Sequence, residues 1–366
     1  MMLSALFGSP TLAFYLGKRF ARAMIIVFMT VFALIYMLDF VELIRRTSDI
    51  PNATSLALAR LSLMRTPSIA EQVLPFAVLF GAMLTLLDLS RKLELVIARA
   101  AGLSAWQFLL APLVVAVVFG AFIVGIYNPI SARLKEKAVS IEAQLLGKNQ
   151  SSDLSDVWIR QKSIDGQAII RAGSLDVLEA RIAPATFFIF DLDNTFMQRV
   201  EASEAFLKDG YWLANKAKVI IPGNEPEIHD TFQISSNLSR QQIKQSYATA
   251  DSIPFWSLPD YIRTTEMAGL DTTRYKQQYQ TLMARPILFA AMVLIAASVS
   301  LRFFRFGGVA RMVLAGIASG FILYIATKLI EDLGAAGILS TTAAAWLPSI
   351  IGGLLGTLAL LYQEDG

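Results

Sequence analysis

The chain has 366 residues, 55% of them hydrophobic and 17% charged, with a mean hydropathy of +0.53 and a formal net charge of +3. This apolar share exceeds that of ordinary soluble domains and indicates a membrane protein, while the small positive charge is typical of residues that flank membrane spans rather than of a nucleic-acid surface. The absence of cysteine excludes disulfides and thiolate metal sites.

Six segments contain no Asp, Glu, Lys or Arg. With a few polar residues at its ends, each reaches the roughly 20 residues that cross about 30 Å of hydrocarbon, so we predict six transmembrane helices. The segments are 23–38, 72–87, 103–132, 286–301, 312–327 and 333–363. The first follows Lys18, Arg19 and Arg22 and lacks a small-residue cleavage pattern, so we expect it to act as an uncleaved targeting signal.

Basic residues in the short loops predict that both termini lie in the cytoplasm, because cytoplasmic loops carry an excess of Lys and Arg. The inner basic residues are then Lys18, Arg19, Arg22, Arg91, Lys92, Arg99, Arg302, Arg305 and Arg311. The outer short loops carry Arg45, Arg46, Arg60 and Arg65, with Lys328 at a span end. The excess of Lys and Arg on the predicted cytoplasmic side is modest. The first loop on the predicted outer side is unusually basic for that side of the membrane.

Between the third and fourth spans, the sequence has the composition of a soluble domain. Short β-branched and aromatic segments alternate with turn signals, which predicts an antiparallel sandwich or roll. Strands are expected at 156–161, 167–172, 186–191, 196–207, 211–221 and 229–235, with turns at 164–166, 191–194, 208–210 and 221–227. Helices are expected at 131–147, 257–270 and 273–285.

The predicted fold is therefore a membrane α-helical protein of six transmembrane helices, with an all-β domain inserted between the third and fourth. Its parts are a first transmembrane half over 1–127, an extracytoplasmic β domain with flanking helices over 128–285, and a second transmembrane half over 286–366. Glycines four residues apart in 316–320 and 352–356 predict close helix contacts, either with a partner subunit or within the chain.

No catalytic motif is found in the sequence. It contains no P-loop for nucleotide hydrolysis, no GxSxG and no HExxH motif. The only histidine, His229, lies far from any paired carboxylates and is expected to be a surface or strand-end residue rather than a metal ligand. We therefore expect neither an enzyme nor a cofactor or metal bound by this chain.

Two arginines, Arg45 and Arg46, follow the first span at the predicted outer boundary of the membrane. Guanidinium groups bind phosphate through paired hydrogen bonds, so these residues are candidates for contact with lipid phosphates. Basic residues at span ends also extend to the headgroups without any specific ligand. From the residues alone, both interpretations stay open.

The loop between the second and third spans, 90–108, predicts a short amphipathic helix that ends at Gly102. We expect Leu93, Val96, Ile97 and Ala100 to face the membrane domain. The expected outward side carries Arg91, Leu95 and Arg99, with Glu94 on its flank, as docking to a cytoplasmic partner would require. A helix resting on lipid headgroups is the alternative, although it leaves Leu95 and Glu94 on the wet side unexplained.

The pattern ELVIARAAGLS (94–104) resembles the coupling segment of the LptF/LptG permeases, subunits of the ABC transporter that extracts lipopolysaccharide from the bacterial inner membrane. The resemblance continues through 63–86, 157–173 and 253–287, and so covers nearly the whole chain. The VWIR strand and the LPDYI…AGLDTTRY stretch are more similar to the LptG branch. The fold implied is six spans with a periplasmic β-jellyroll between the third and fourth.

The resemblance also implies the partners. They are an LptF-like permease, a cytoplasmic ATPase dimer that binds the ATP, an LptC-like single-span subunit and an LptA-like periplasmic carrier, with lipopolysaccharide as the cargo. Spans one and five are expected to line the seam to the permease partner. The jellyroll interior is expected to shelter acyl chains.

Site residues follow from the same resemblance. Glu94, at the position of the family's coupling glutamate, is expected to meet the ATPase, and a push through 90–104 is expected to move the lipid. Arg45 and Arg46 match a basic pair that contacts substrate phosphates, whereas Asp39 stands where relatives have a further basic residue.

Two other interpretations remain open. A mechanotransmitting membrane subunit of the FtsX/MacB type also places a similar segment near an ATPase, but typically has four spans with the outer domain after the first. A non-transport scaffold could instead anchor an envelope assembly through its outer domain. The number of spans separates the first from the permease interpretation, and lipid crosslinking separates the second.

Overall fold

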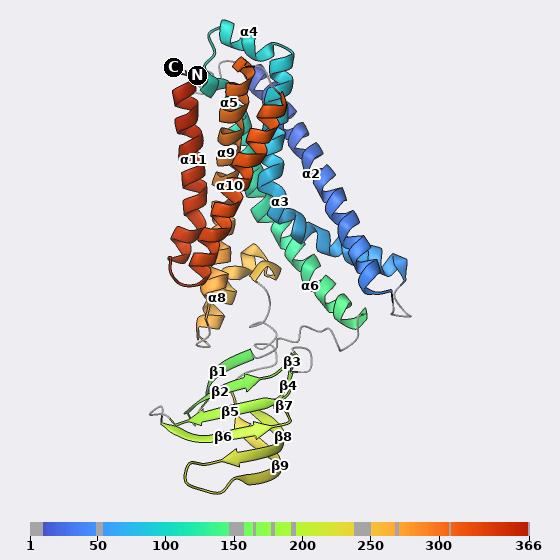
Figure 1. The fold of residues 1–366 in the computed structure, drawn as a ribbon, viewed down its shortest axis with the longest axis vertical. Helices are drawn as coiled ribbons and strands as arrows, with labels where there is room; N and C mark the ends of the chain where they lie inside the picture. Colours follow the sequence, from blue (N-terminus) through green and yellow to red (C-terminus); the bar gives the residue numbers. More distant parts are fainter. Residues whose placement is uncertain are drawn as a thin grey trace. The chain divides into compact units, whose positions relative to one another are not determined.

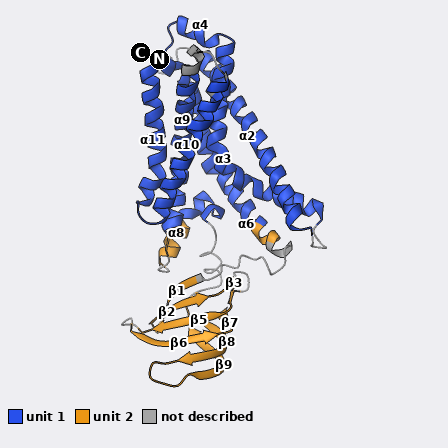
Figure 2. Cartoon of the chain, in the orientation of Figure 1, with its two compact units in different colours: residues 1–138, 250–259, 273–366 blue, residues 139–249, 260–272 orange. Residues whose placement is uncertain are grey.

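The computed structural model describes residues 10–48, 54–145, 157–163, 166–176, 180–191, 195–237, 250–267, 271–306 and 309–364. The chain divides into two compact units (Figure 2). Unit 1 comprises residues 1–138, 250–259 and 273–366 and holds the apolar helices; unit 2 comprises residues 139–249 and 260–272 and holds the sheet.

The prediction of six membrane-spanning helices is confirmed within the described residues. The helices of unit 1 are α2 (Pro10–Arg46), α3 (Ser55–Arg91), α4 (Glu94–Ala100), α5 (Ala105–Phe122), η1 (Ile123–Tyr127), α6 (Asn128–Leu145, whose last turns lie in unit 2), α9 (Thr273–Phe306), α10 (Val309–Ala335) and α11 (Thr341–Glu364). Helices α5, η1 and α6 form the third span without a break. Helix α4 lies at the same end of the bundle as the start of α2 and the end of α11 (Figure 1).

Two predicted boundaries are wrong. The segment 333–363 is not one span, because α10 continues to Ala335 and a turn with Gly337 at φ +75° separates it from α11. The region 273–285 is not a separate helix but the first turns of α9. Both errors arise because charge and turn signals mark where a helix leaves the membrane, not where its backbone ends.

The bundle core joins spans that are far apart in the sequence. Fully buried Phe20, Leu79 and Phe289 belong to one apolar cluster contributed by α2, α3, α5, η1, α9 and α10. The glycines of α10 pack within the chain, since a Cβ on Gly316 would lie 2.2 Å from the Met83 side chain of α3. Of the two predicted uses of the 316–320 glycines, the intrachain contact is the one observed.

Within the described residues, the β domain is one antiparallel sheet of nine strands. They are β1 (Val157–Ser163), β2 (Gly166–Ala172), β3 (Leu175–Asp176), β4 (Arg181–Ile182), β5 (Ala185–Phe190), β6 (Phe196–Ala202), β7 (Glu204–Lys208), β8 (Tyr211–Ile220) and β9 (Glu227–Ser235). Their order is β1-β2-β5-β6-β8-β7-β4-β3, with β9 also paired to β8. The sheet curls into a half-barrel, and the predicted fold class is confirmed.

The predicted strand 196–207 is two strands, and this prediction is corrected. Strand β6 ends at Ala202 and β7 begins at Glu204, with the Ser203 backbone N–H and hydroxyl both bonded to Asn215 O, at 3.2 and 3.1 Å. Both strands then pair with the long strand β8, β6 over its second half and β7 over its first. The break between β6 and β7 consists of one residue, Ser203, and does not interrupt the alternation of apolar residues. The sequence pattern therefore gave no sign of it.

Alternate residues of the strands fill the inside of the half-barrel, as the period of two requires. Phe187 and Trp212 are fully buried there. The buried amide of Gln161 accepts hydrogen bonds from the Trp212 indole at 3.2 Å and from the Ser236 hydroxyl at 2.7 Å, and its Nε2 donates to Ser235 O at 3.0 Å. One β1 side chain therefore binds the end of β9, which lies at the other side of the sheet.

The helices flanking the sheet are α6 and α8 (Leu258–Met267), and the turns η2 (Ala250–Ser252) and η3 (Phe255–Ser257) precede α8. Predicted helices 131–147 and 257–270 correspond to α6 and α8; residues 146–147 and 268–270 lie outside the described residues. The turn residues 164–165 and 192–194 also lie outside them.

Candidate functional site

The segment 90–104 is not a single helix. Helix α3 runs to Arg91, Leu93 adopts a left-handed conformation at φ 60°, and α4 then runs from Glu94 to Ala100. The predicted stop is confirmed at Gly102, which has φ +86°. Its N–H donates to Arg99 O at 2.9 Å and the Leu103 N–H donates to Ala98 O at 3.1 Å, the pair of bonds that defines a Schellman motif.

The predicted facing of α4 is wrong. Leu95 is only 5% exposed and packs in a cluster with Phe108, whereas Leu93, Val96 and Ile97 are 57%, 44% and 66% exposed. The helix carries apolar residues on both sides, so periodicity could not decide which side packs. The left-handed turn at Leu93 fixes the direction in which the chain enters α4, and this direction turns Leu95 inward.

Glu94 is bound within the chain by Arg19 of α2. The guanidinium Nη1 donates to Glu94 Oε1 and Oε2 at 3.0 and 2.9 Å, and Nη2 contacts Asp88 of α3. The Tyr15 hydroxyl donates to Glu94 Oε2 at 3.1 Å. The Arg19 side chain is 15% exposed and that of Glu94 is 32% exposed, so the acid remains within reach of a partner. We call Arg19, Asp88 and Glu94 the inner triad.

The other predicted coupling residues differ in setting. Arg91 is exposed at the end of α3. Arg99 is half-buried, and its Nε atom is buried without a hydrogen-bond partner within the described residues. The surface that α4 presents therefore combines Arg91, the half-exposed Glu94 and the exposed pair Val96 and Ile97. The prediction from the sequence placed Val96 and Ile97 on the packed side of the helix and so missed them as an exposed surface. The helical periodicity groups these two residues together but does not show which way they face.

At the opposite end of α2, Arg45 and Arg46 are 78% and 52% exposed. Both bind Glu42, with Arg45 Nη2 to Oε2 and Arg46 Nε to Oε1 each at 2.8 Å. Exposed pairs of this kind contribute little stability, and each guanidinium has five N–H donors. The arginines therefore keep donors for a phosphate while Glu42 holds them together.

Asp39, about one turn before Glu42 in α2, faces Arg65 of α3 with 3.5 Å between Oδ1 and Nη2. The Asp39 side chain is 10% exposed, and its Oδ2 is buried without a hydrogen-bond partner within the described residues. This acid thus lies beside a cation from the next helix. Proximity between α2 and α3 at this height could not be read from the sequence spacing.

Within the described residues, no group of three or more His, Cys, Asp or Glu side chains is placed to hold a metal ion. His229 lies on β9 with its Nε2 3.3 Å from Glu227 Oε2; the histidine is half-exposed and the glutamate is exposed. This placement agrees with the strand-end setting expected for the histidine.

A family model described as lipopolysaccharide export system permease LptF/LptG matches residues 14–363. The chain is 23% identical over 350 residues to the lipopolysaccharide export system permease protein LptG of Escherichia coli (strain K12), a match that covers 93% of each chain. It is 22% identical over 374 residues to the protein of the same name from Haemophilus influenzae, with 96% of each chain covered. The family match covers α2 from residue 14 onward and the whole of α4.

Proposed function

Because the chain belongs to the LptF/LptG family of lipopolysaccharide export system permeases, we propose that it forms one membrane half of the export transporter beside an LptF-like permease. It is a multi-pass membrane permease and not an enzyme, and ATP hydrolysis belongs to a separate subunit. The family match over residues 14–363 is the observation that carries the proposal. Six spans also argue against an FtsX/MacB-type subunit with four.

In this proposal the chain lies in the bacterial inner membrane with its β domain in the periplasm. Two spans precede α4 and three precede the β domain, so the two lie on opposite sides of any membrane that the helices cross. The charge bias favours the cytoplasm for α4. The β domain then faces the compartment in which an LptC-like subunit and an LptA-like carrier would receive the lipid.

Helix α4 is the proposed docking element for a cytoplasmic ATPase dimer. It offers a carboxylate at Glu94, a cation at Arg91 and the apolar surface of Val96 and Ile97. Interfaces gain affinity from apolar contacts that exclude water around a few charged pairs. Leu95 and the ion pair of Glu94 with Arg19 hold α4 to the bundle, so a push on this surface reaches the spans.

The proposed cargo is lipopolysaccharide, whose phosphates would be bound by Arg45 and Arg46 at the outer end of α2. A phosphate offers more acceptor oxygens than the shared Glu42 carboxylate, so it can bind the donors that Glu42 leaves unused. From there the acyl chains would pass to the β domain, whose interior is lined by apolar side chains.

The seam to the partner permease is proposed along α2 and α10. In their most apolar 18-residue windows, 6% of α2 and 17% of α10 is buried inside the chain, against 39% or more for the other four spans. Spans packed so little by their own chain have the most surface left for a second subunit and for lipid.

The test is charge reversal at Glu94. The tagged chain is purified from native membrane as Glu94→Arg, with Glu225→Arg, an exposed acid in the β8–β9 connection, as the matched control. The reversed side chain repels Arg19 and any cation of the ATPase, so the ATPase should be lost while the control retains it. Normal recovery of the ATPase with Glu94→Arg would contradict the proposal.

A further inference from the structure

Helix α2 reaches both candidate sites, because Arg19 binds Glu94 near one end and Arg45 and Arg46 lie at the other. From Lys18 to Arg46 its sequence has no glycine or proline, and the helix is continuous (Figure 1). Kinks in long helices arise almost always at such residues or at inserted groups. A displacement of Arg19 at the inner end is therefore carried along the helix toward Arg45 and Arg46.

Helix α2 packs against α3 at several points, and one of them is a close backbone approach at Gly81. A Cβ built on Gly81 would lie 2.7 Å from Met24 Cα and 3.0 Å from Met24 N, so the two backbones meet where only glycine fits. Met24 is 2% exposed and Phe20, one turn away, is fully buried. Small residues let helix backbones approach closely in lipid. We call Met24 and Gly81 the fulcrum.

The fulcrum divides α2 into unequal arms. Arg19 lies five residues from Met24 and Arg45 lies 21 residues on the other side. At a rise of 1.5 Å per residue, the arms measure about 7.5 and about 32 Å. The outer arm is roughly four times the inner one, so a tilt that moves Arg19 by about 1 Å moves Arg45 by about 4 Å in the opposite direction.

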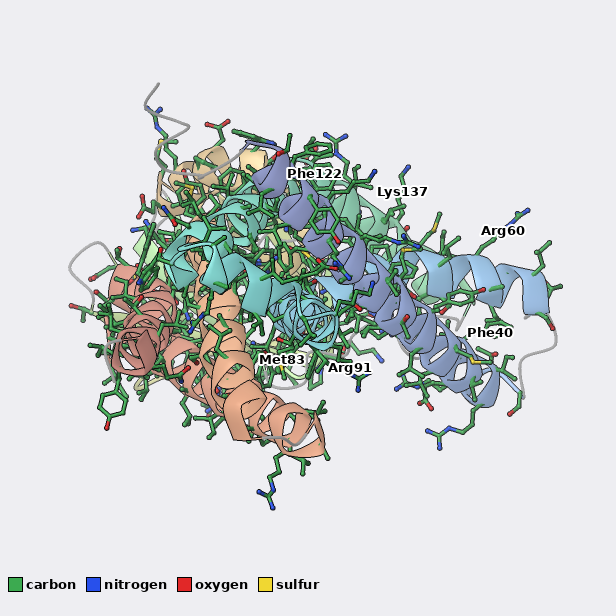
Figure 3. All side chains as sticks on the ribbon, turned by 90° about the horizontal axis from the view of Figure 1, so that it is seen from above. Phe40, Arg60, Met83, Arg91, Phe122 and Lys137 are labelled. Atoms are coloured by element: carbon green, nitrogen blue, oxygen red, sulfur yellow. The ribbon has the colours of Figure 1, made fainter. Side chains whose placement is uncertain are left out.

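The outer arm is placed to move. Its residues Leu34, Met37 and Val41 are 57%, 66% and 60% exposed, and only 6% of the most apolar 18-residue window of α2 is buried inside the chain. Seen from above, Phe40 and Arg60 lie to one side of the helices around Met83 (Figure 3).

The start of α3 accompanies this arm. The Ser62 hydroxyl donates to Tyr36 O at 3.2 Å, and Arg65 faces Asp39. Helix α3 then contains Pro67 and Pro75, which remove backbone hydrogen bonds and make that stretch the natural place for bending.

The inner arm is held by the inner triad. Arg19 binds both oxygens of Glu94 and also contacts Asp88, so α4 cannot shift without moving either Arg19 or the last turn of α3. A guanidinium whose side chain is mostly buried and that bonds to two acids makes a stronger link than an exposed single pair. The ion pair is thus the direct link between α4 and α2.

We propose that α2 is a lever: Arg19 is the positioning residue through which α4 drives it, the contact of Met24 with Gly81 is its fulcrum, and the lipid-binding arginines ride on its long arm. The inference rests on the proposed function, because it takes α4 as the motor contact and Arg45 with Arg46 as the lipid contact. It adds to that function a positioning residue, Arg19, a pivot at Met24 and Gly81, and opposite movements of the two ends of α2.

Distances between spin labels test the lever in the complete complex. The chain has no native cysteine, so pairs can be introduced and labelled singly, provided that the partner subunits offer no reactive thiol. Each pair joins one exposed position on α2 to one on α11. The pairs are Lys18 with Leu358, Ile26 with Leu354, and Val41 with Ile350.

Trapping the ATPase with nucleotide and vanadate should change the outer distance most, leave the distance at Ile26 nearly constant, and shift Lys18 in the opposite sense. Equal shifts at all three positions would mean that α2 slides as a whole and would overturn the lever. A complex that contains no ATPase would overturn the proposed function itself, so the two failures are distinct.

Variants at Arg19 test whether this residue transmits the movement of α4 to α2. Arg19→Gln should reduce the outer-arm shift at least twofold while the ATPase stays bound, and Arg19→Lys, which keeps the charge, should restore part of it. If Arg19 only stabilised the fold, both variants would have lower thermal stability, but the distance change of the outer arm would be the same in the two. An undiminished shift in Arg19→Gln would overturn the role of Arg19.

Discussion

The guanidinium of Arg285 in α9 contacts Glu71 Oε1 in α3, although 214 residues separate the two in the sequence. Asn128 Nδ2 donates to the same oxygen at 2.9 Å, and the Asn128 Oδ1 accepts from the Phe255 N–H at 3.0 Å. The Glu71 and Arg285 side chains are 7% and 14% exposed. One polar cluster therefore holds three spans and the segment that follows the β domain.

Glu71→Leu should destabilise the protein by about 3 to 5 kcal/mol, because it leaves the Arg285 charge buried without its partner. The double variant Glu71→Leu with Arg285→Leu should recover most of that loss. Thermal unfolding of the purified protein in detergent measures both. The control is Glu42→Leu, a half-exposed acid whose loss should leave the unfolding free energy nearly unchanged. Equal losses for Glu71→Leu and the double variant would contradict the prediction.

Leu95→Ala and Ile97→Ala should separate folding from docking. Leu95 is buried, so its truncation should cost about 2 to 5 kcal/mol of stability, whereas exposed Ile97 should cost less than about 0.5 kcal/mol. Ile97→Ala should instead weaken retention of the ATPase in pull-downs at matched protein levels. If Leu95→Ala left the melting temperature unchanged, the inward facing of Leu95 would be wrong.

Gly120→Ala should destabilise the contact between α5 and α9 by about 1 to 3 kcal/mol, because its Cβ would lie 2.5 Å from Pro286 Cα. Gly353→Ala is the matched control, since its Cβ would meet Ala291 Cβ at 3.9 Å, an ordinary contact. The control should be neutral or stabilise α11 by up to about 1 kcal/mol through helix propensity. Chemical denaturation of the two variants side by side is the measurement, and a Gly120→Ala protein as stable as the control would refute the close approach.

Arg46→Ala should lower the lipopolysaccharide recovered with the complex by about 10-fold or more, because charge-assisted hydrogen bonds contribute about 1.5 to 3 kcal/mol each. Arg46→Lys should recover only part, since lysine keeps the charge but not the paired donors. Quantified lipid phosphate per complex provides the readout. Arg60→Ala, at the exposed start of α3, is the control and should retain the lipid; an equal loss there would indicate general charge attraction rather than a site.

The sequence by itself determined the six spans and the inserted β domain. Both follow from local properties: apolar runs long enough for a bilayer, and a period of two between turn residues. The same holds for the helix stop at Gly102, because a left-handed residue is needed where the chain leaves α4.

Only the tertiary structure decided which side of α4 packs, what binds Glu94 and where the glycines of α10 lie. Each depends on contacts between residues far apart in the chain: Leu95 with Phe108, Glu94 with Arg19, and Gly316 with Met83. The split of 196–207 into β6 and β7 depends likewise on hydrogen bonds to Asn215 of β8. Local patterns in the sequence show where apolar and charged residues recur. Which residue each of them contacts depends on how distant parts of the chain come together, and local patterns carry no information about that.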